Sequence, residues 1–123
     1  MPDFSVLVVD DEKDFLDTTV KRLLKRSIDA VGAASGEEAL ALMRKRSFDV
    51  IVLDVKMPGG MDGIQALREM KRIQPLAEVI LLTGHASVET SIDGVKLDAF
   101  DYLLKPVSLE DLMVKLNQAF EKR

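Results

Sequence analysis

Short apolar runs alternate with amphipathic segments along this chain, and the alternation constrains the fold more than any other feature. The clearest run is Val50-Ile51-Val52-Leu53, which leads into Asp54 and is soon followed by Pro58-Gly59-Gly60. A continuous apolar run this short, bounded by turn residues, is typical of a strand buried on both faces. Such strands occur in parallel sheets covered by helices, so the sequence favours an α/β fold.

Five strands and five helices are predicted in strict alternation. The strands are expected at residues 6–9, 29–34, 50–53, 79–83 and 100–104. The helices, from apolar spacing and end signals, are expected at residues 14–26, 35–46, 63–73, 87–96 and 108–121. Ser35 and Glu38 have the spacing of a capping box at the start of the second helix. The pattern predicts one domain, residues 1–123, built as a doubly wound five-stranded parallel sheet.

Composition excludes several classes of protein. The 123 residues are 47% apolar, which is ample for one core. Charges of both signs are mixed, the formal net charge is -4, and no basic patch stands out, so direct nucleic-acid binding by this segment is not expected. There is no cysteine, which excludes disulfides and thiolate metal sites. No apolar run reaches membrane-spanning length and no signal peptide is visible, so we expect a cytoplasmic protein that does not enter the membrane.

Chemically active residues stand where four of the predicted strands end. Asp10 and Asp11 follow the first strand, Asp54 ends the third, Thr83 ends the fourth and Lys105 follows the fifth. In a parallel sheet these ends share one edge, which is where ligands bind. If the first, third, fourth and fifth strands are neighbours, these side chains can converge in one shallow cleft. Three carboxylates about 6 Å apart repel one another by roughly 3 kcal/mol per pair at an effective dielectric near 20. Such a cluster needs a cation, and oxygen ligands suit Mg²⁺.

These residue types predict phosphoryl transfer. Carboxylates, a divalent cation, a lysine and a hydroxyl can together hold a phosphoryl group during transfer. One carboxylate can itself be the nucleophile and form an aspartyl phosphate. Singly, each residue has a plainer explanation, since Asp54 could end its strand, Thr83 could cap the next helix and Lys105 could be a surface lysine. Their coincidence at four strand ends favours a common site.

The same residues resemble the receiver domain of two-component response regulators. Four motifs carry this resemblance over essentially the whole chain: Val8-Val9-Asp10-Asp11-Glu12, Leu53-Asp54-Val55-Lys56-Met57-Pro58, Met61-Asp62-Gly63 and Asp101-Tyr102-Leu103-Leu104-Lys105-Pro106. Residues 83–106 look most like receivers of NtrC-type transcriptional activators. The resemblance implies a flavodoxin-like (βα)5 fold with strand order 2-1-3-4-5. It also implies a phosphorelay domain that is not an enzyme, because it catalyses only its own phosphorylation and dephosphorylation.

The resemblance implies a role for each site residue. Asp54 would accept a phosphoryl group from the phosphohistidine of a sensor histidine kinase or a phosphotransfer protein. Asp11, Asp54 and the backbone carbonyl of Lys56 would bind Mg²⁺, and Asp10 would assist through a water molecule. Contacts to the phosphoryl oxygens would come from Thr83, Lys105 and the backbone amide of Gly84.

The resemblance further implies a conformational switch. Pro106 would follow a cis peptide bond that aims Lys105 into the site. Tyr102 would swing inward as Thr83 moves toward the phosphoryl group. This movement would couple the site to the face built from the fourth helix, the fifth strand and the fifth helix, which could also join two copies of the chain in a homodimer.

Two positions depart from the family pattern. Gly59 and Gly60 separate Pro58 from Met61, where the family usually has one residue, so the loop leaving the site should be longer and looser. Asp98 stands where glycine is common, and we expect it to adopt a positive φ, which Asp tolerates better than most residues.

Two other classes of function stay open at this point. A Mg²⁺-dependent phosphohydrolase with an Asp nucleophile needs similar groups, but it usually has an acid where this chain has Lys56, and it needs a cap that no insertion provides. An interaction module of the same fold would not need the intact set of acids, threonine and lysine. Lys56 and His85 lie two residues after Asp54 and Thr83 and could flank the path of attacking water, although His85 is also typical of an exposed loop residue. We expect substitutions at either position to change the lifetime of the phosphoryl group more than phosphorylation itself.

Overall fold

Five parallel strands form a sheet in the part of the chain that the structure, a computed structural model, describes: residues 4–57, 60–84 and 88–122. The strands are β1 (Ser5–Val9), β2 (Asp29–Ala33), β3 (Val50–Asp54), β4 (Glu78–Thr83) and β5 (Asp101–Leu104). The helices are α1 (Lys13–Lys25), α2 (Gly36–Met43), α3 (Gly63–Ile73), α4 (Val88–Lys96) and α5 (Leu109–Lys122). The strand order is β2-β1-β3-β4-β5, which confirms the predicted fold.

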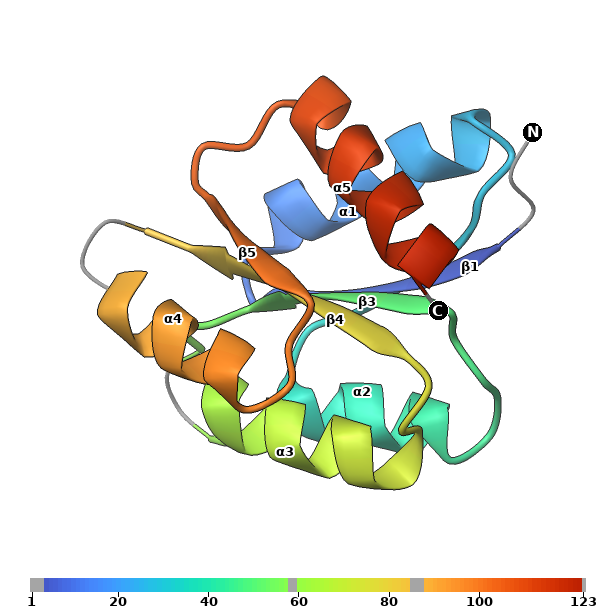
Figure 1. Cartoon of the computed structure of the whole chain (residues 1–123). Helices are drawn as coiled ribbons and strands as arrows, with labels where there is room; N and C mark the ends of the chain where they lie inside the picture. The colour runs from blue at the N-terminus through green and yellow to red at the C-terminus, as the bar shows by residue number, and fades with distance from the viewer. Residues whose placement is uncertain (1–3, 58–59, 85–87, 123) are drawn as a thin grey trace.

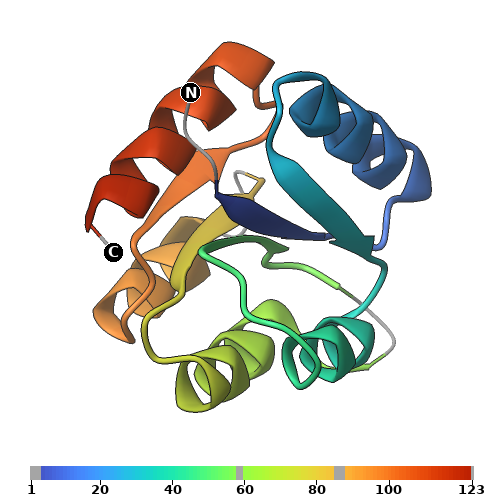
Figure 2. The ribbon, with the colours of Figure 1, turned by 90° about the vertical axis from the view of Figure 1, so that its right-hand side faces the viewer.

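Helices cover both faces of the sheet (Figure 1, and from the side in Figure 2). Helices α1 and α5 lie on one face, and α2, α3 and α4 lie on the other. Alternate residues of β3 supply the two cores: Ile51 and Leu53 face α2 and α3, whereas Val50 and Val52 face α1 and α5. This double burial explains why the apolar run of β3 is continuous rather than alternating.

The helix starts follow the sequence with one difference. The Ser35 hydroxyl accepts a hydrogen bond from the Glu38 N–H at 3.1 Å, as expected for a capping box. The Glu38 carboxylate, however, accepts from the N–H of Ala34 at 3.2 Å, one residue before the predicted partner. A complete capping box occurs at α3, where Asp62 and Gln65 exchange hydrogen bonds of 2.9 and 3.1 Å. This second box goes beyond the sequence prediction, although Asp-x-x-Gln has the required spacing.

Asp98 has a φ of 91°, which confirms the positive φ expected at this position. On α1, Leu24 is 51% exposed, because its neighbour Leu23 occupies the buried position. Among the described residues, no helix has the length and apolar character needed to cross a membrane.

Candidate functional site

The carboxyl ends of four strands place the predicted side chains at one edge of the sheet. Asp10 follows β1, Asp54 ends β3, Thr83 ends β4 and Lys105 follows β5. The register pairs Asp54 with Leu82 and therefore brings the ends of β3 and β4 to the same level. The topology thus gathers groups that are as much as 95 positions apart in the chain.

Lys105 lies between two carboxylates. Its Nζ donates a hydrogen bond to Oδ2 of Asp10 at 3.1 Å and is 3.4 Å from Oδ1 of Asp54. Both acids are buried, with 0% and 6% of Asp10 and Asp54 exposed, whereas the Lys105 side chain is 27% exposed. The peptide bond between Lys105 and Pro106 is cis, as the resemblance implied. The ammonium therefore partly neutralises two buried charges while it stays accessible to solvent.

Burial and neighbouring charges shift the pKa values of both Asp54 and Lys105. Burial, and secondarily the charge of Asp10, raise the pKa of Asp54 from its ordinary 3.8 to about 6, although Lys105 and a hydrogen bond from the Lys56 backbone act in the opposite direction. Burial alone would lower the pKa of Lys105, but hydrogen bonds and charges from Asp10 and Asp54 outweigh it and leave that pKa raised. At pH 7 the site therefore holds a lysine cation beside a carboxylate that is mostly ionised.

Asp10, Asp11 and Asp54 form the carboxylate cluster that the sequence predicted. Each offers an oxygen atom that lies within 4.8 Å of the other two, and Asp11 is exposed to solvent. The N–H of Glu12 donates to Oδ1 of Asp10 at 2.9 Å and fixes this carboxylate at the end of β1. Three carboxylates at this spacing provide the oxygen donors that Mg²⁺ prefers, so the residues fit the predicted ion.

The remaining predicted residues lie around the ends of β4 and β5. Thr83 is 1% exposed, and its hydroxyl donates to the backbone carbonyl of Gly84 at 3.0 Å. Gly84 is exposed, and a Cβ added to it would meet no atom within 4 Å. Tyr102 is half-buried against the core under α2, α3 and α4, on the strand next to Thr83. The hydroxyl, the open backbone and the aromatic ring therefore occupy neighbouring positions.

Two residues hold the loop that leaves Asp54. The Gly63 N–H donates to the Val55 carbonyl at 3.0 Å, and a Cβ on Gly63 would stand 2.6 Å from both Cα and O of Val55. The side chain of Glu37, on α2, accepts a hydrogen bond from the Met61 N–H at 3.1 Å. Gly63 is part of a motif noted in the sequence, but its packing role and the contact of Glu37 were not predicted. An exposed acid early in a helix carries no sequence signal for such a contact.

Three residues named in the sequence predictions, Pro58, Gly59 and His85, lie outside the described residues. Gly60 is described and is exposed. A Cβ on Gly60 would lie 3.1 Å from Oε2 of Glu37, so the second glycine passes close to the carboxylate that holds the loop.

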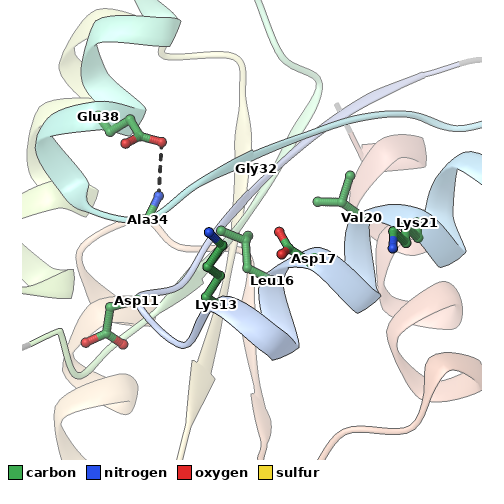
Figure 3. A pocket seen from close by; sticks show the side chains of 9 residues that line it. All are labelled: Asp11, Lys13, Leu16, Asp17, Val20, Lys21, Gly32, Ala34 and Glu38. Carbon is green, nitrogen blue, oxygen red and sulfur yellow. Dashed lines mark hydrogen bonds between the residues drawn. The ribbon is translucent and has the colours of Figure 1, made fainter.

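A groove of about 600 Å³ lies between α1 and β2, beside the carboxylate cluster (Figure 3). Asp11 stands at one end, and Leu16, Val20 and Gly32 form part of the wall. The rim carries charges of both signs, from Lys13, Asp17, Lys21 and Glu38. Mixed charge does not favour an ionic ligand of either sign, so we place the candidate site at the carboxylate cluster and not in this groove.

Comparison with known proteins identifies the family of the chain. The model of the response regulator receiver domain family matches residues 6–117. The chain belongs to this family. Its receiver sequence is 39% identical over 116 residues to the transcriptional regulatory protein ZraR of Escherichia coli O157:H7, a match that covers 93% of this chain and 26% of ZraR. A putative NtrX-like response regulator of Rickettsia bellii is 32% identical, over 94% of this chain and 24% of that protein.

Solved receiver domains have the same fold. A response regulator receiver domain protein from Clostridium thermocellum is 36% identical, with a TM-score of 0.91 over 97% of this chain and 95% of that one. The receiver domain of NtrX from Brucella abortus is 29% identical, with a TM-score of 0.91 over 96% and 99% of the two chains. This receiver domain therefore resembles those of NtrC-type regulators, and it spans about a quarter of the length of the curated relatives it matches.

Proposed function

We propose that this receiver domain takes a phosphoryl group from the phosphohistidine of a sensor histidine kinase, or of a phosphotransfer protein, onto Asp54. The observation that carries the proposal is the position of Asp54 at the end of β3, with the Lys105 ammonium at 3.4 Å and two further carboxylates in the same cluster. A nucleophile, a cation for the phosphoryl oxygens and a set of metal ligands are thus within reach of one point.

Asp54 acts as the nucleophile in this proposal. Since its pKa is about 6, the carboxylate is mostly ionised at pH 7 and can attack phosphorus. A bond forms between a carboxylate oxygen and phosphorus while the phosphorus–nitrogen bond of phosphohistidine breaks, and the imidazole nitrogen keeps the electron pair. Lys105 offsets negative charge on the transferred group, because its ammonium is already beside Asp54.

Mg²⁺ is the proposed cofactor, held by Asp11, Asp54 and the backbone carbonyl of Lys56, with Asp10 acting through water. When bound, the ion would neutralise the carboxylates and the phosphoryl oxygens, as divalent cations do in phosphoryl transfer. Asp10, Asp11 and Asp54 support this proposal, because each offers a carboxylate oxygen within 4.8 Å of the other two.

The phosphoryl group is proposed to switch the face formed by α4, β5 and α5. The Thr83 hydroxyl now donates to the carbonyl of Gly84, so a contact with a phosphoryl oxygen would replace this bond and move the end of β4. Tyr102, on the adjacent strand, would follow inward. Exposed apolar side chains on this face support its use in a homodimer; they are Ile92, Leu97, Leu104 and Val114.

We further propose that the domain is not an enzyme with a separate substrate, and that it works in the cytoplasm with its kinase. Lys56, an exposed residue, stands where a phosphohydrolase of this type usually has its proton donor. The domain would then catalyse only its own phosphorylation and dephosphorylation. Because ZraR is a transcriptional regulatory protein, we propose transcriptional control as the output of the regulator to which this domain belongs.

A mass measurement tests the phosphoryl transfer. We expect the protein to gain one phosphoryl group from acetyl phosphate and Mg²⁺, and to lose this ability in Asp54→Asn or in excess EDTA. Asp17→Asn, which removes the same charge from an exposed position on α1, should behave as the wild type. No adduct with either acetyl phosphate or a kinase would favour an interaction module instead. Steady turnover of phosphate esters would favour a phosphohydrolase.

A further inference from the structure

An aromatic ring makes a third contact with Lys105, beside those of the two carboxylates. The Lys105 Nζ lies 5.2 Å from the centroid of the Phe15 ring. An ammonium within about 6 Å of a ring centroid is attracted by the negative face of the ring. Phe15 is the third residue of α1, so this helix contributes a contact to the lysine that the site chemistry requires.

The ring itself is held in place. Phe15 is half-buried against the core under α1 and α5, and with Leu82 and Leu109 it lines a groove of about 140 Å³ between these helices. The turn between β1 and α1 fixes both the ring and a carboxylate, because the Glu12 N–H donates to Asp10 at 2.9 Å and α1 begins at the next residue. One short segment therefore presents two of the groups that surround the ammonium.

We propose that Phe15 is a positioning residue for Lys105. A lysine side chain is long and flexible, and this one is 27% exposed, so contacts with two carboxylates alone leave it considerable freedom. The ring restricts that freedom and keeps the ammonium directed toward Asp10 and Asp54. The expected effect on phosphorylation rests on the proposed function. The contact between the Phe15 ring and Lys105 does not depend on it.

Three variants separate this role from ordinary packing. Phe15→Leu removes the ring and keeps apolar bulk, whereas Phe15→Tyr keeps the ring face and should restore wild-type behaviour. Phe100→Leu is the matched control, because Phe100 is also half-buried on the same core and has a lysine, Lys122, with Nζ 5.8 Å from its ring centroid. Phe100 directly precedes β5 and therefore lies at the amino ends of the strands, whereas the site lies at their carboxyl ends.

The first measurement is the NMR shift of the ε-methylene protons of Lys105 in the metal-free protein. We expect the ring current of Phe15 to move them upfield in the wild type and in Phe15→Tyr. The displacement should be lost in Phe15→Leu and kept in Phe100→Leu. Protons without such a displacement in the wild type would overturn the proposal.

The second measurement is a double-mutant cycle with Lys105→Gln, read as the unfolding equilibrium constant in EDTA. Phe15→Leu should change this constant about two- to five-fold more when Lys105 is present than when it is absent. An equal effect in both backgrounds would overturn the proposal, because the ring would then act through packing alone.

The third measurement is the rate of phosphorylation by acetyl phosphate with Mg²⁺, which should fall about two- to five-fold in Phe15→Leu and stay unchanged in Phe15→Tyr and Phe100→Leu. An unchanged rate in Phe15→Leu would overturn the positioning role. If the wild type takes no phosphoryl group at all, the proposed function fails, and the NMR shift and the cycle still decide whether the ring holds Lys105.

Discussion

Replacing Asp54 by Asn removes the charge at the centre of the carboxylate cluster, and we predict that this change stabilises the metal-free fold. Burial and the neighbouring Asp10 raise the pKa of Asp54 from 3.8 to about 6. Since one unit corresponds to about 1.4 kcal/mol, the ionised carboxylate opposes folding by about 3 kcal/mol at most. Solvent reaches the site beside Lys105 and screens part of this unfavourable electrostatic energy. We therefore expect Asp54→Asn to gain about 1–2 kcal/mol in the free energy of unfolding at pH 7.

The gain from Asp54→Asn should depend on pH in a definite direction. Because the pKa of Asp54 is higher in the folded than in the unfolded state, the folded wild type binds more protons between about pH 4 and about pH 6. Wild-type stability contributed by this group therefore falls as the pH rises through that window. The variant has no carboxyl group to titrate at position 54. The excess of its free energy of unfolding over that of the wild type should therefore be complete above about pH 6 and vanish near pH 4.

Urea unfolding followed by far-ultraviolet circular dichroism in EDTA measures both effects. Asp17→Asn is the control, because it removes one unit of charge from an exposed position on α1. Added Mg²⁺ should narrow the difference between wild type and Asp54→Asn, since an ion that binds the folded wild type stabilises it. An Asp54→Asn variant that is no more stable than the wild type at pH 7, or a gain that persists at pH 4, would refute the electrostatic reasoning.

Other substitutions test the surroundings of the site. Gly63→Ala should lower the free energy of unfolding by about 1–3 kcal/mol and weaken Mg²⁺ binding in calorimetric titration, because the new Cβ would stand 2.6 Å from Val55 backbone atoms; unchanged affinity would contradict this. Gln74→Ala should destabilise the fold by about 2–3 kcal/mol in urea, because its side chain makes three hydrogen bonds to residues 43–48, yet Mg²⁺ affinity should not change. Lys105→Gln should strengthen Mg²⁺ binding, because it removes a cation from the carboxylate cluster, while it slows phosphorylation; weaker binding would count against the arrangement.

The sheet was predictable because strands buried on both faces leave a short, uninterrupted apolar run, as Val50 to Leu53 show. Helix ends were less predictable. The carboxylate of Glu38 bonds to Ala34 rather than to Ser35, since the backbone angles of the cap decide which N–H a side chain can reach. Spacing alone does not contain those angles.

The gathering of site residues was predictable for a topological reason. Parallel strands end at a common edge, so Asp10, Asp54 and Lys105 were expected at that edge once the strands were assigned. The strand order implied by the family resemblance, which the structure has, then brings them within contact distance of one another. The contacts of Glu37 with the loop and of Phe15 with Lys105 could not be predicted in this way. They depend on how α2 and α1 pack on the sheet, and that packing has no signature in the spacing of residues.

Whether Asp54 itself carries the phosphoryl group is tested most directly by chemical trapping. Borohydride reduces an acyl phosphate, so a phosphorylated aspartate becomes homoserine, which peptide mass spectrometry can locate. After treatment with acetyl phosphate and Mg²⁺, we predict homoserine at position 54 and unchanged aspartates at positions 10 and 11. Homoserine at position 10 or 11, or a phosphoryl group on the protein without any homoserine, would contradict the proposal.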